Sequence, residues 1–184
     1  MRNHVIIAHG MSELDLFRGI LAWTGQDAVI YSRNNGRNNI AISHLDRILR
    51  EAPFTSEKAL HDSYPELRYN SRGRQKMPDL RIFPVMDYDG DNANVLPYIT
   101  GNYPEGVPLG EFVTPVLNYP NMEATMDAIG YDVRGIDKGD FYKNLVRGLR
   151  RRDDILGFYG RLRDCDCTNM EVVLFHMLER HPDY

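Results

Sequence analysis

The chain has little of the residues that mark several specialised protein classes. Its 184 residues include two cysteines and one tryptophan. Two cysteines are too few for a disulfide-stabilised framework, and Cys165 and Cys167 are separated by one residue, a spacing at which a disulfide rarely forms. A zinc site of the C-x-C type would need a second cysteine pair. We therefore expect free thiols and a reducing, cytoplasmic location.

Long hydrophobic runs and an excess of positive charge are also missing. No apolar stretch approaches the ~20 residues of a transmembrane helix, and Val5–Ala8 is too short for the core of a signal peptide. We expect no membrane partner. The formal net charge is −4, so the chain has no overall attraction to nucleic acid. Binding of nucleic acid would require a local basic surface or bound metal ions.

Hydrophobic patterning predicts strands that alternate with helices. The predicted strands are Val5–Ala8, Ala28–Ser32, Leu80–Met86 and Glu111–Leu117. The predicted helices are 12–23, Ile40–Leu49, Met122–Ile129, Phe141–Arg152, Ile155–Arg163 and Met170–Arg180. Residues 51–79 are polar enough for at most a short helix, and residues 95–110 show no regular pattern. Pro84 is unfavourable in a central strand because it lacks an N–H group, so it suggests an edge strand or a bulge.

This order of elements predicts an α/β fold with a mainly parallel sheet flanked by helices. We expect an α/β domain of this kind over residues 1–135, with a C-terminal helical appendage, residues 136–184, packed on it. Ligands of such sheets bind beyond the carboxyl ends of the strands. The loops 9–13, 33–39 and 87–91, each following a predicted strand, should therefore converge.

The loop after the third strand carries three acidic residues, Asp87, Asp89 and Asp91. Carboxylates this close repel one another, and a hard divalent cation such as Mg²⁺ or Mn²⁺ removes that conflict. The calcium loop of an EF-hand is excluded, because its Gly and Glu positions hold Asn92 and Tyr98 here. A metal site and a solvated acidic turn both remain open.

Two further candidates follow the first strand. Glu13 lies at the start of the first predicted helix, either as a metal ligand or general base, or as an acid favoured there by the helix dipole. His9 ends the strand, where it is a ligand, a group that activates water, or a residue that fills the strand end.

The loop after the second strand is rich in hydrogen-bond donors. Arg33, Asn34, Asn35 and Arg37 surround a glycine in the sequence R-N-N-G-R-N-N. These side chains suit the binding of phosphate oxygens in a nucleic acid. An ordinary Asn-Gly turn is the alternative.

These motifs together resemble the Toprim family of topoisomerases, DnaG-type primases and OLD-family nucleases. The resemblance covers about residues 4–130 and extends to small bacterial proteins that open with an H-G-x-S-E segment, here residues 9–13. It implies that Asp87 and Asp89 are the D-x-D ligands of Mg²⁺, with Glu13 or His9 in place of the first acid. Toprim proteins carry Glu directly before the first Gly, where this chain has His9. That departure implies a rearranged site or lost activity.

The resemblance implies a Mg²⁺-dependent phosphoryl-transfer protein, a nuclease above all, with a role in bacterial defence against phage or foreign nucleic acid. The alternative is a non-catalytic binding or accessory module. In that case the acidic pocket recognises a cation and the C-terminal helices dock a partner protein.

Overall fold

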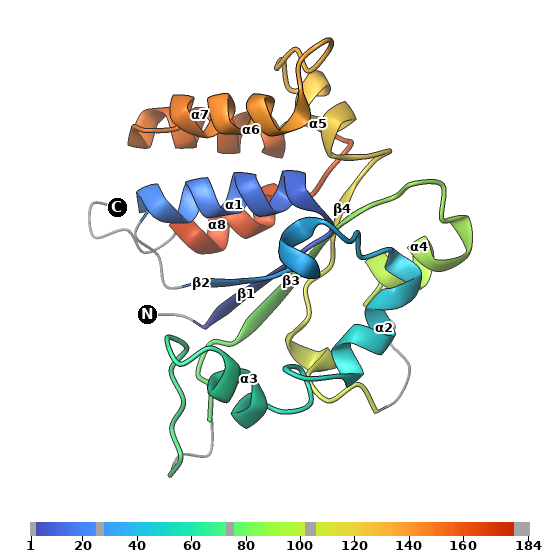
Figure 1. Ribbon diagram of the computed structural model, residues 1–184, viewed down its shortest axis with the longest axis vertical. Helices are drawn as coiled ribbons and strands as arrows, with labels where there is room; N and C mark the ends of the chain where they lie inside the picture. The colour runs from blue at the N-terminus through green and yellow to red at the C-terminus, as the bar shows by residue number, and fades with distance from the viewer. Residues whose placement is uncertain (1–2, 25–27, 73–75, 102–105, 179–184) are drawn as a thin grey trace.

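The computed structural model describes residues 3–24, 28–72, 76–101 and 106–178 of the chain. A four-stranded sheet has the order β2-β1-β3-β4, and every pairing is parallel. The strands are β1 (His4–Ala8), β2 (Ala28–Tyr31), β3 (Arg81–Asp87) and β4 (Val116–Asn118). Helices cover both faces of this sheet (Figure 1). The predicted α/β class with a parallel sheet is therefore confirmed.

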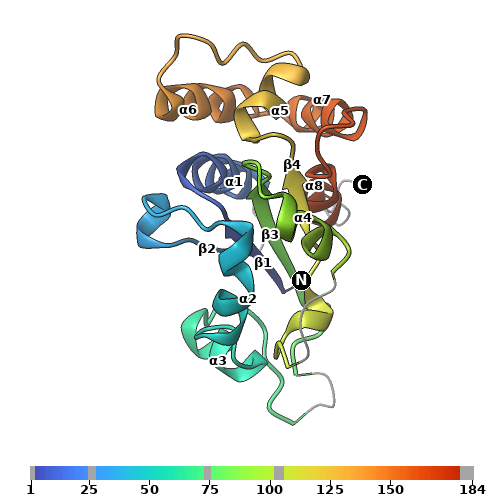
Figure 2. The ribbon, with the colours of Figure 1, turned by 90° about the vertical axis from the view of Figure 1, so that its right-hand side faces the viewer.

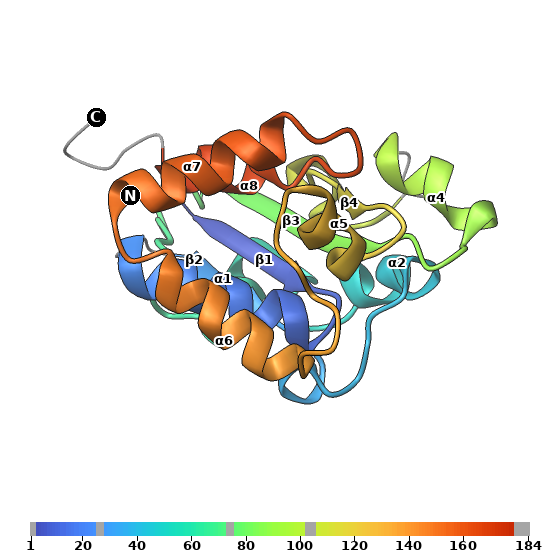
Figure 3. The same cartoon turned by 90° about the horizontal axis from the view of Figure 1, so that it is seen from above.

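Two layers of helix lie on one face of the sheet (Figures 1 and 2). Helices α1 (Met11–Thr24) and α8 (Glu171–Leu178) form the inner layer. Helices α5 (Met122–Ala128), α6 (Lys138–Gly148) and α7 (Arg152–Arg163) form the outer layer, with α6 packed along α1 (Figure 3). Apolar residues of all five helices join Ile6, Phe83 and Val116 of the sheet in one core.

The opposite face of the sheet packs against shorter helices. These are α2 (Ile42–Arg50), α3 (Glu57–Ser63) and α4 (Asn92–Ile99), with single 3-10 turns at η1 (Asn34–Gly36) and η2 (Gly110–Phe112). Successive residues of β1 alternate between the two cores, because Val5 and Ile7 face this side and Ile6 the other. Strand β1 is consequently buried along its whole length, as the continuous apolar run predicts.

Within the part of the chain that the structure describes, no helix is long and apolar enough to cross a bilayer.

The prediction of an edge strand or a bulge at Pro84 is wrong. Strand β3 lies between β1 and β4, and its register with β1 continues through Pro84. The Ile82 carbonyl accepts from the Thr114 N–H on the β4 side. Residues two apart in a strand face the same neighbouring strand, so the N–H that Pro84 lacks would also have pointed toward β4. At this point the Tyr98 hydroxyl lies between β3 and β4. It donates to the Pro84 carbonyl (2.6 Å) and accepts from the Val116 N–H (3.0 Å).

Two other predicted segments differ from the structure. Strand β4 covers only Val116–Asn118, because residues 110–112 form a 3-10 turn and Pro115 cannot donate to a ladder. Residues 92–99, for which no helix was predicted, form α4. Its start is fixed by Asp91, whose carboxylate accepts from the Asn94 N–H (3.3 Å).

The ends of the C-terminal helices also shift relative to the prediction. Helix α6 begins at Lys138 because the Asp137 carboxylate caps it, accepting from the Asp140 N–H (3.2 Å). It ends at Gly148, and Arg152 already belongs to α7. Helix α8 is described to Leu178, and the last two residues of the predicted helix lie outside the described ones.

The expectation of free thiols is wrong, because Cys165 and Cys167 are joined by a disulfide. The turn after α7 brings their Cα atoms to 5.4 Å, inside the range that a disulfide requires. The cytoplasmic location stays a prediction and loses the support of these cysteines, since disulfides persist in oxidising surroundings.

The hydroxyl of Tyr98 gives a test of how the sheet accommodates Pro84. We expect Tyr98→Phe to lower the free energy of unfolding by about 1–3 kcal/mol, because it leaves the buried Val116 N–H without this partner. Urea denaturation measures the loss. Tyr119→Phe is the matched control, since Tyr119 is 55% exposed and its hydroxyl should contribute little. Equal stability of the two variants would contradict this account.

Candidate metal centre

A pocket of about 390 Å³ lies at the carboxyl edge of the sheet. The loops after β1, β2 and β3 meet there, as the topology predicts, and the starts of α5 and α6 complete it. It is lined by residues 9–13, Gly36, Arg37, Asn39, Asp87, Asp89, Asn121, Glu123 and Lys138.

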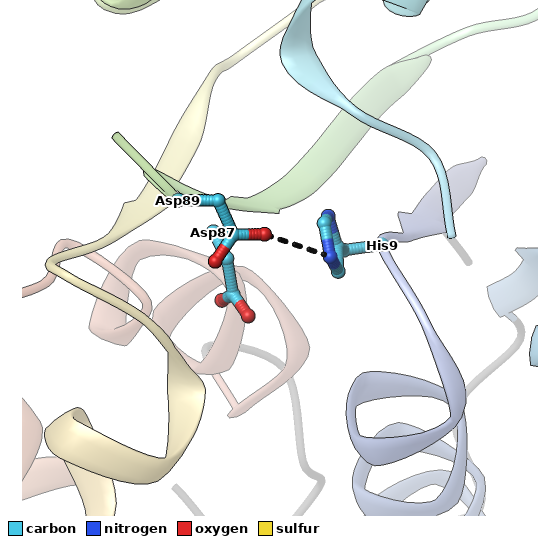
Figure 4. Close-up of side chains that lie close together, drawn as sticks. All are labelled: His9, Asp87 and Asp89. Carbon is cyan, nitrogen blue, oxygen red and sulfur yellow. Dashed lines mark ion pairs between the residues drawn. The ribbon is translucent and has the colours of Figure 1, made fainter. Parts of the chain in front are cut away.

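Three potential metal ligands come together in this pocket: His9, Asp87 and Asp89 (Figure 4). One ligand atom of each lies within 4.8 Å of the other two, and His9 Nε2 lies 3.5 Å from Asp89 Oδ2. A cation with ligand distances of about 2.1 Å separates opposite ligands by about 4.2 Å. Small side-chain shifts would therefore let one ion contact all three atoms.

The backbone of His9 is fixed from both sides. Its N–H donates to the Val85 carbonyl of β3 (3.1 Å), and its carbonyl accepts from the Ile40 N–H (2.8 Å). The His9 side chain is only 6% exposed, and Nδ1 has no hydrogen-bond partner among the described residues. His9 is consequently held in place at the pocket with one ring nitrogen unused.

A tight turn directs Asp89 toward His9. Asp89 and Gly90 both have positive φ (46° and 80°), and the Asp91 N–H donates to the Tyr88 carbonyl (2.9 Å). This is the geometry of a type I′ turn, for which Asp-Gly is a preferred sequence. The turn sends Asp91 away to cap α4, so the structure places Asp91 outside the pocket-lining set.

Glu13 combines a structural role with an unused oxygen atom. Its Oε2 accepts from the Gly10 N–H (2.9 Å), the contact that the third residue of a helix makes in a capping box. An added Cβ at Gly10 would lie 2.9 Å from Asn39 Oδ1, so a larger residue here would have to displace the Asn39 side chain. The other oxygen, Oε1, is buried without a hydrogen-bond partner among the described residues, although the side chain lines the pocket.

A chain of side-chain hydrogen bonds orients Asp87. The Asn118 Nδ2 donates to Asp87 Oδ1 (3.2 Å), and the Thr168 hydroxyl donates to Asn118 Oδ1 (2.8 Å). Because Thr168 occupies the oxygen of this amide, the Asn118 NH₂ group must face Asp87. The segment before α8 thereby positions a candidate ligand at the end of β3.

Burial and neighbouring charges raise the pKa of the acids in the pocket. Burial raises the pKa of Glu13 above its usual range. Burial, and then the charge of Glu13, raise the pKa of Asp87 to about 8, and Asp89 and Glu123 act in the same direction. Without a cation, this group of carboxyls therefore retains a proton near neutral pH.

Two charged residues of the pocket escaped the sequence reasoning, Glu123 and Lys138. Glu123 Oε1 accepts from the Ser12 hydroxyl (3.1 Å) and lies 3.1 Å from Lys138 Nζ. Glu123 follows β4 as Glu13 follows β1, so the rule of strand ends applied to the fourth strand would have found it. Lys138 has no comparable signal, since only the packing of α6 on α1 brings it here.

The four predicted phosphate-binding residues are divided by the structure. Arg37 lines the pocket, whereas Arg33, Asn34 and Asn35 do not. Asn34 and Asn35 have positive φ (47° and 52°), a conformation that Asn tolerates well. The backbone conformation of the turn therefore favours Asn at both positions, whether or not the turn binds phosphate.

The donor set of the trio, two carboxylates and one imidazole, suits Mg²⁺, Mn²⁺ and related divalent ions. No family model, curated protein or solved structure matches the chain. Membership of the Toprim family stays a prediction from the motifs.

The raised pKa of Asp87 predicts how stability depends on pH. Its pKa is about 8 in the folded protein and near 3.8 when unperturbed, so the folded state binds more protons between these values. The metal-free protein should therefore lose stability as the pH rises from about 4 to about 8. Urea denaturation in EDTA at pH 5 and pH 8 measures this loss.

The variant Asp87→Asn should reverse this loss, because it removes the titrating carboxyl. We expect the free energy of unfolding of this variant to exceed that of the wild type by at least about 1 kcal/mol at pH 8 in EDTA. This lower bound is modest, because a shift of one pKa unit already corresponds to about 1.4 kcal/mol. Asp91→Asn should follow the wild type at both pH values, since Asn also caps helices. A wild-type stability that stays constant from pH 5 to pH 8 would show that Asp87 is not perturbed.

Proposed function

We propose that the pocket binds a divalent cation, Mg²⁺ or Mn²⁺, through His9, Asp87 and Asp89, and that the protein hydrolyses phosphodiester bonds of nucleic acid. The observation that carries the proposal is the meeting of these three side chains in one pocket. The surroundings fit a cation, because Glu13 Oε1 is buried in the pocket without a hydrogen-bond partner among the described residues. A bound cation would also relieve the repulsion between the carboxyls.

The side chains around the trio have roles that follow from their chemistry. A divalent cation supplies Lewis-acid polarisation of a phosphate group. Glu13, with its raised pKa and free Oε1, can accept and hold a proton inside the pocket. Arg37 and Lys138 offer positive charge to phosphate oxygens at the pocket lining. Asn118 keeps Asp87 oriented.

The biological setting that we propose comes from the Toprim resemblance. It is defence of a bacterial cell against phage or foreign nucleic acid, carried out in the cytoplasm. This part of the proposal rests on analogy between motifs and folds.

Metal binding tests the first half of the proposal. We expect isothermal titration with Mn²⁺ to show binding to the wild type and at least about tenfold weaker binding to Asp89→Asn, which removes one ligand charge. Asn tolerates the positive φ of this position, so the turn should survive. The matched control is Asp91→Asn, two residues away, which should bind as the wild type does.

Absence of binding to the wild type at millimolar Mn²⁺ or Mg²⁺ would rule out the metal centre. Equal weakening by Asp89→Asn and Asp91→Asn would point to general electrostatic attraction.

Cleavage of nucleic acid tests the second half. Among labelled single-stranded and double-stranded DNA and RNA, at least one substrate should be cut in Mg²⁺ and remain intact in EDTA. The Asp89→Asn variant should cut at least about tenfold more slowly than Asp91→Asn. Metal binding without cleavage of any substrate would instead favour a non-catalytic module.

One observation favours that second candidate function. A cavity of about 650 Å³ lies between the segment after α5 and helices α6 and α7. Its floor includes the buried Phe141 and Phe158, and Gly148 and Gly157 leave open space beside it. A ligand or a segment of a partner protein has room to bind there.

A further inference from the structure

Two tyrosine rings form a pair directly beside the acidic turn. Tyr88 lies between Asp87 and Asp89 in the chain, and Tyr119 lies between Asn118 and Pro120. The ring centroids are 4.8 Å apart and the planes are tilted by 37°. Tyr119 is nevertheless 55% exposed, so this pair presents aromatic surface to solvent at the edge of the candidate metal centre.

The backbone of both tyrosines is pinned. The Tyr88 N–H donates to the Asn118 carbonyl (3.0 Å), and the Tyr119 N–H donates to the Cys167 carbonyl (2.7 Å). The Tyr88 hydroxyl hydrogen-bonds with the Asn92 side chain of α4. Tyr119 is therefore an exposed ring on a fixed backbone, and its contact with the Tyr88 ring limits its freedom before any ligand arrives, which lowers the entropic cost of binding.

The exposed ring of Trp23 has a different environment. Trp23 is 46% exposed, but the guanidinium of Arg150 lies over its ring at 5.4 Å from the centroid. It also lies at the far end of α1 from the pocket, whose residues begin that helix. Trp23 thus offers a comparison for an exposed ring that is distant from the acidic site.

The same peptide segments carry the ring pair and the pocket. Asp87 and Asp89 flank Tyr88, while Asn121, two residues beyond Tyr119, lines the pocket. The Asp89 N–H also donates to the Pro120 carbonyl (3.2 Å), which ties the two segments together. The backbone of Tyr119 therefore lies next to the segment that carries Asp89, although neither tyrosine ring lines the pocket itself.

We propose that Tyr119 stacks on one unpaired base of a nucleic-acid strand whose phosphate is held at His9, Asp87 and Asp89. The inference rests on the proposed function and deepens it, because it names single-stranded nucleic acid as the substrate class. Bases stack on aromatic side chains largely irrespective of sequence, whereas bases inside a duplex are not free to do so. Arg37 and Lys138 at the pocket complement the charge of the strand.

Binding of matched strands tests the proposal. Fluorescence anisotropy in Mg²⁺, at low temperature, compares a labelled deoxyadenylate oligonucleotide with an abasic oligonucleotide of equal length and charge. We expect Tyr119→Ala to weaken binding of the base-bearing strand about tenfold and to change binding of the abasic strand less than twofold. Tyr119→Phe should retain wild-type affinity, and Trp23→Ala should have no effect.

The outcomes separate this inference from the proposed function. Mg²⁺-dependent binding of both strands, with no selective effect of Tyr119→Ala, would overturn the stacking role and leave the metal centre intact. Absence of Mg²⁺-dependent binding of either strand to the wild type would overturn both. Tighter binding of a duplex than of the base-bearing single strand would overturn the assigned substrate class.

Discussion

Glu13 and Asp87 place two buried carboxyl groups in the same pocket, and the cost of ionising them there governs its chemistry. Each is put there by an element that the fold needs for other reasons, the first turn of α1 and the carboxyl end of β3. Burial opposes ionisation of both groups, and the charge of Glu13 further raises the pKa of Asp87. Such a pair is tolerated when it keeps a proton or when a cation supplies the opposite charge. The pocket is therefore preorganised for positive charge.

Rigid elements support the side chains around this pair. The His9 backbone is hydrogen-bonded to β3 and to the segment before α2, while Asn118 and Thr168 fix the orientation of Asp87. Asp89 is the exception, since it lies half-exposed on a two-residue turn. A site with buried, fixed ligands and one accessible ligand can admit an ion from solvent without unfolding its surroundings.

Much of the sheet could be predicted because local pattern determined it. The apolar runs gave β1, β2 and β3, and topology then predicted that Glu13 and the Asp87 loop would converge. Long-range contacts account for the failures. Pro84 lies in an interior strand where Tyr98, from a helix that was not predicted, bridges the Pro84 carbonyl and the Val116 N–H of β4. Lys138 reaches the pocket through the packing of α6 on α1, which periodicity within a segment does not encode.

The position of a bound ion tests the central claim most directly. Crystals of the protein soaked in Mn²⁺ and measured by anomalous X-ray diffraction would show where the metal lies. The account predicts one strong peak within about 2.0–2.6 Å of His9 Nε2 and of oxygen atoms of Asp87 and Asp89. Glu13 would lie beside it without losing its contact with Gly10. A map with no peak in this pocket, or with peaks only at exposed carboxylates elsewhere, would contradict it.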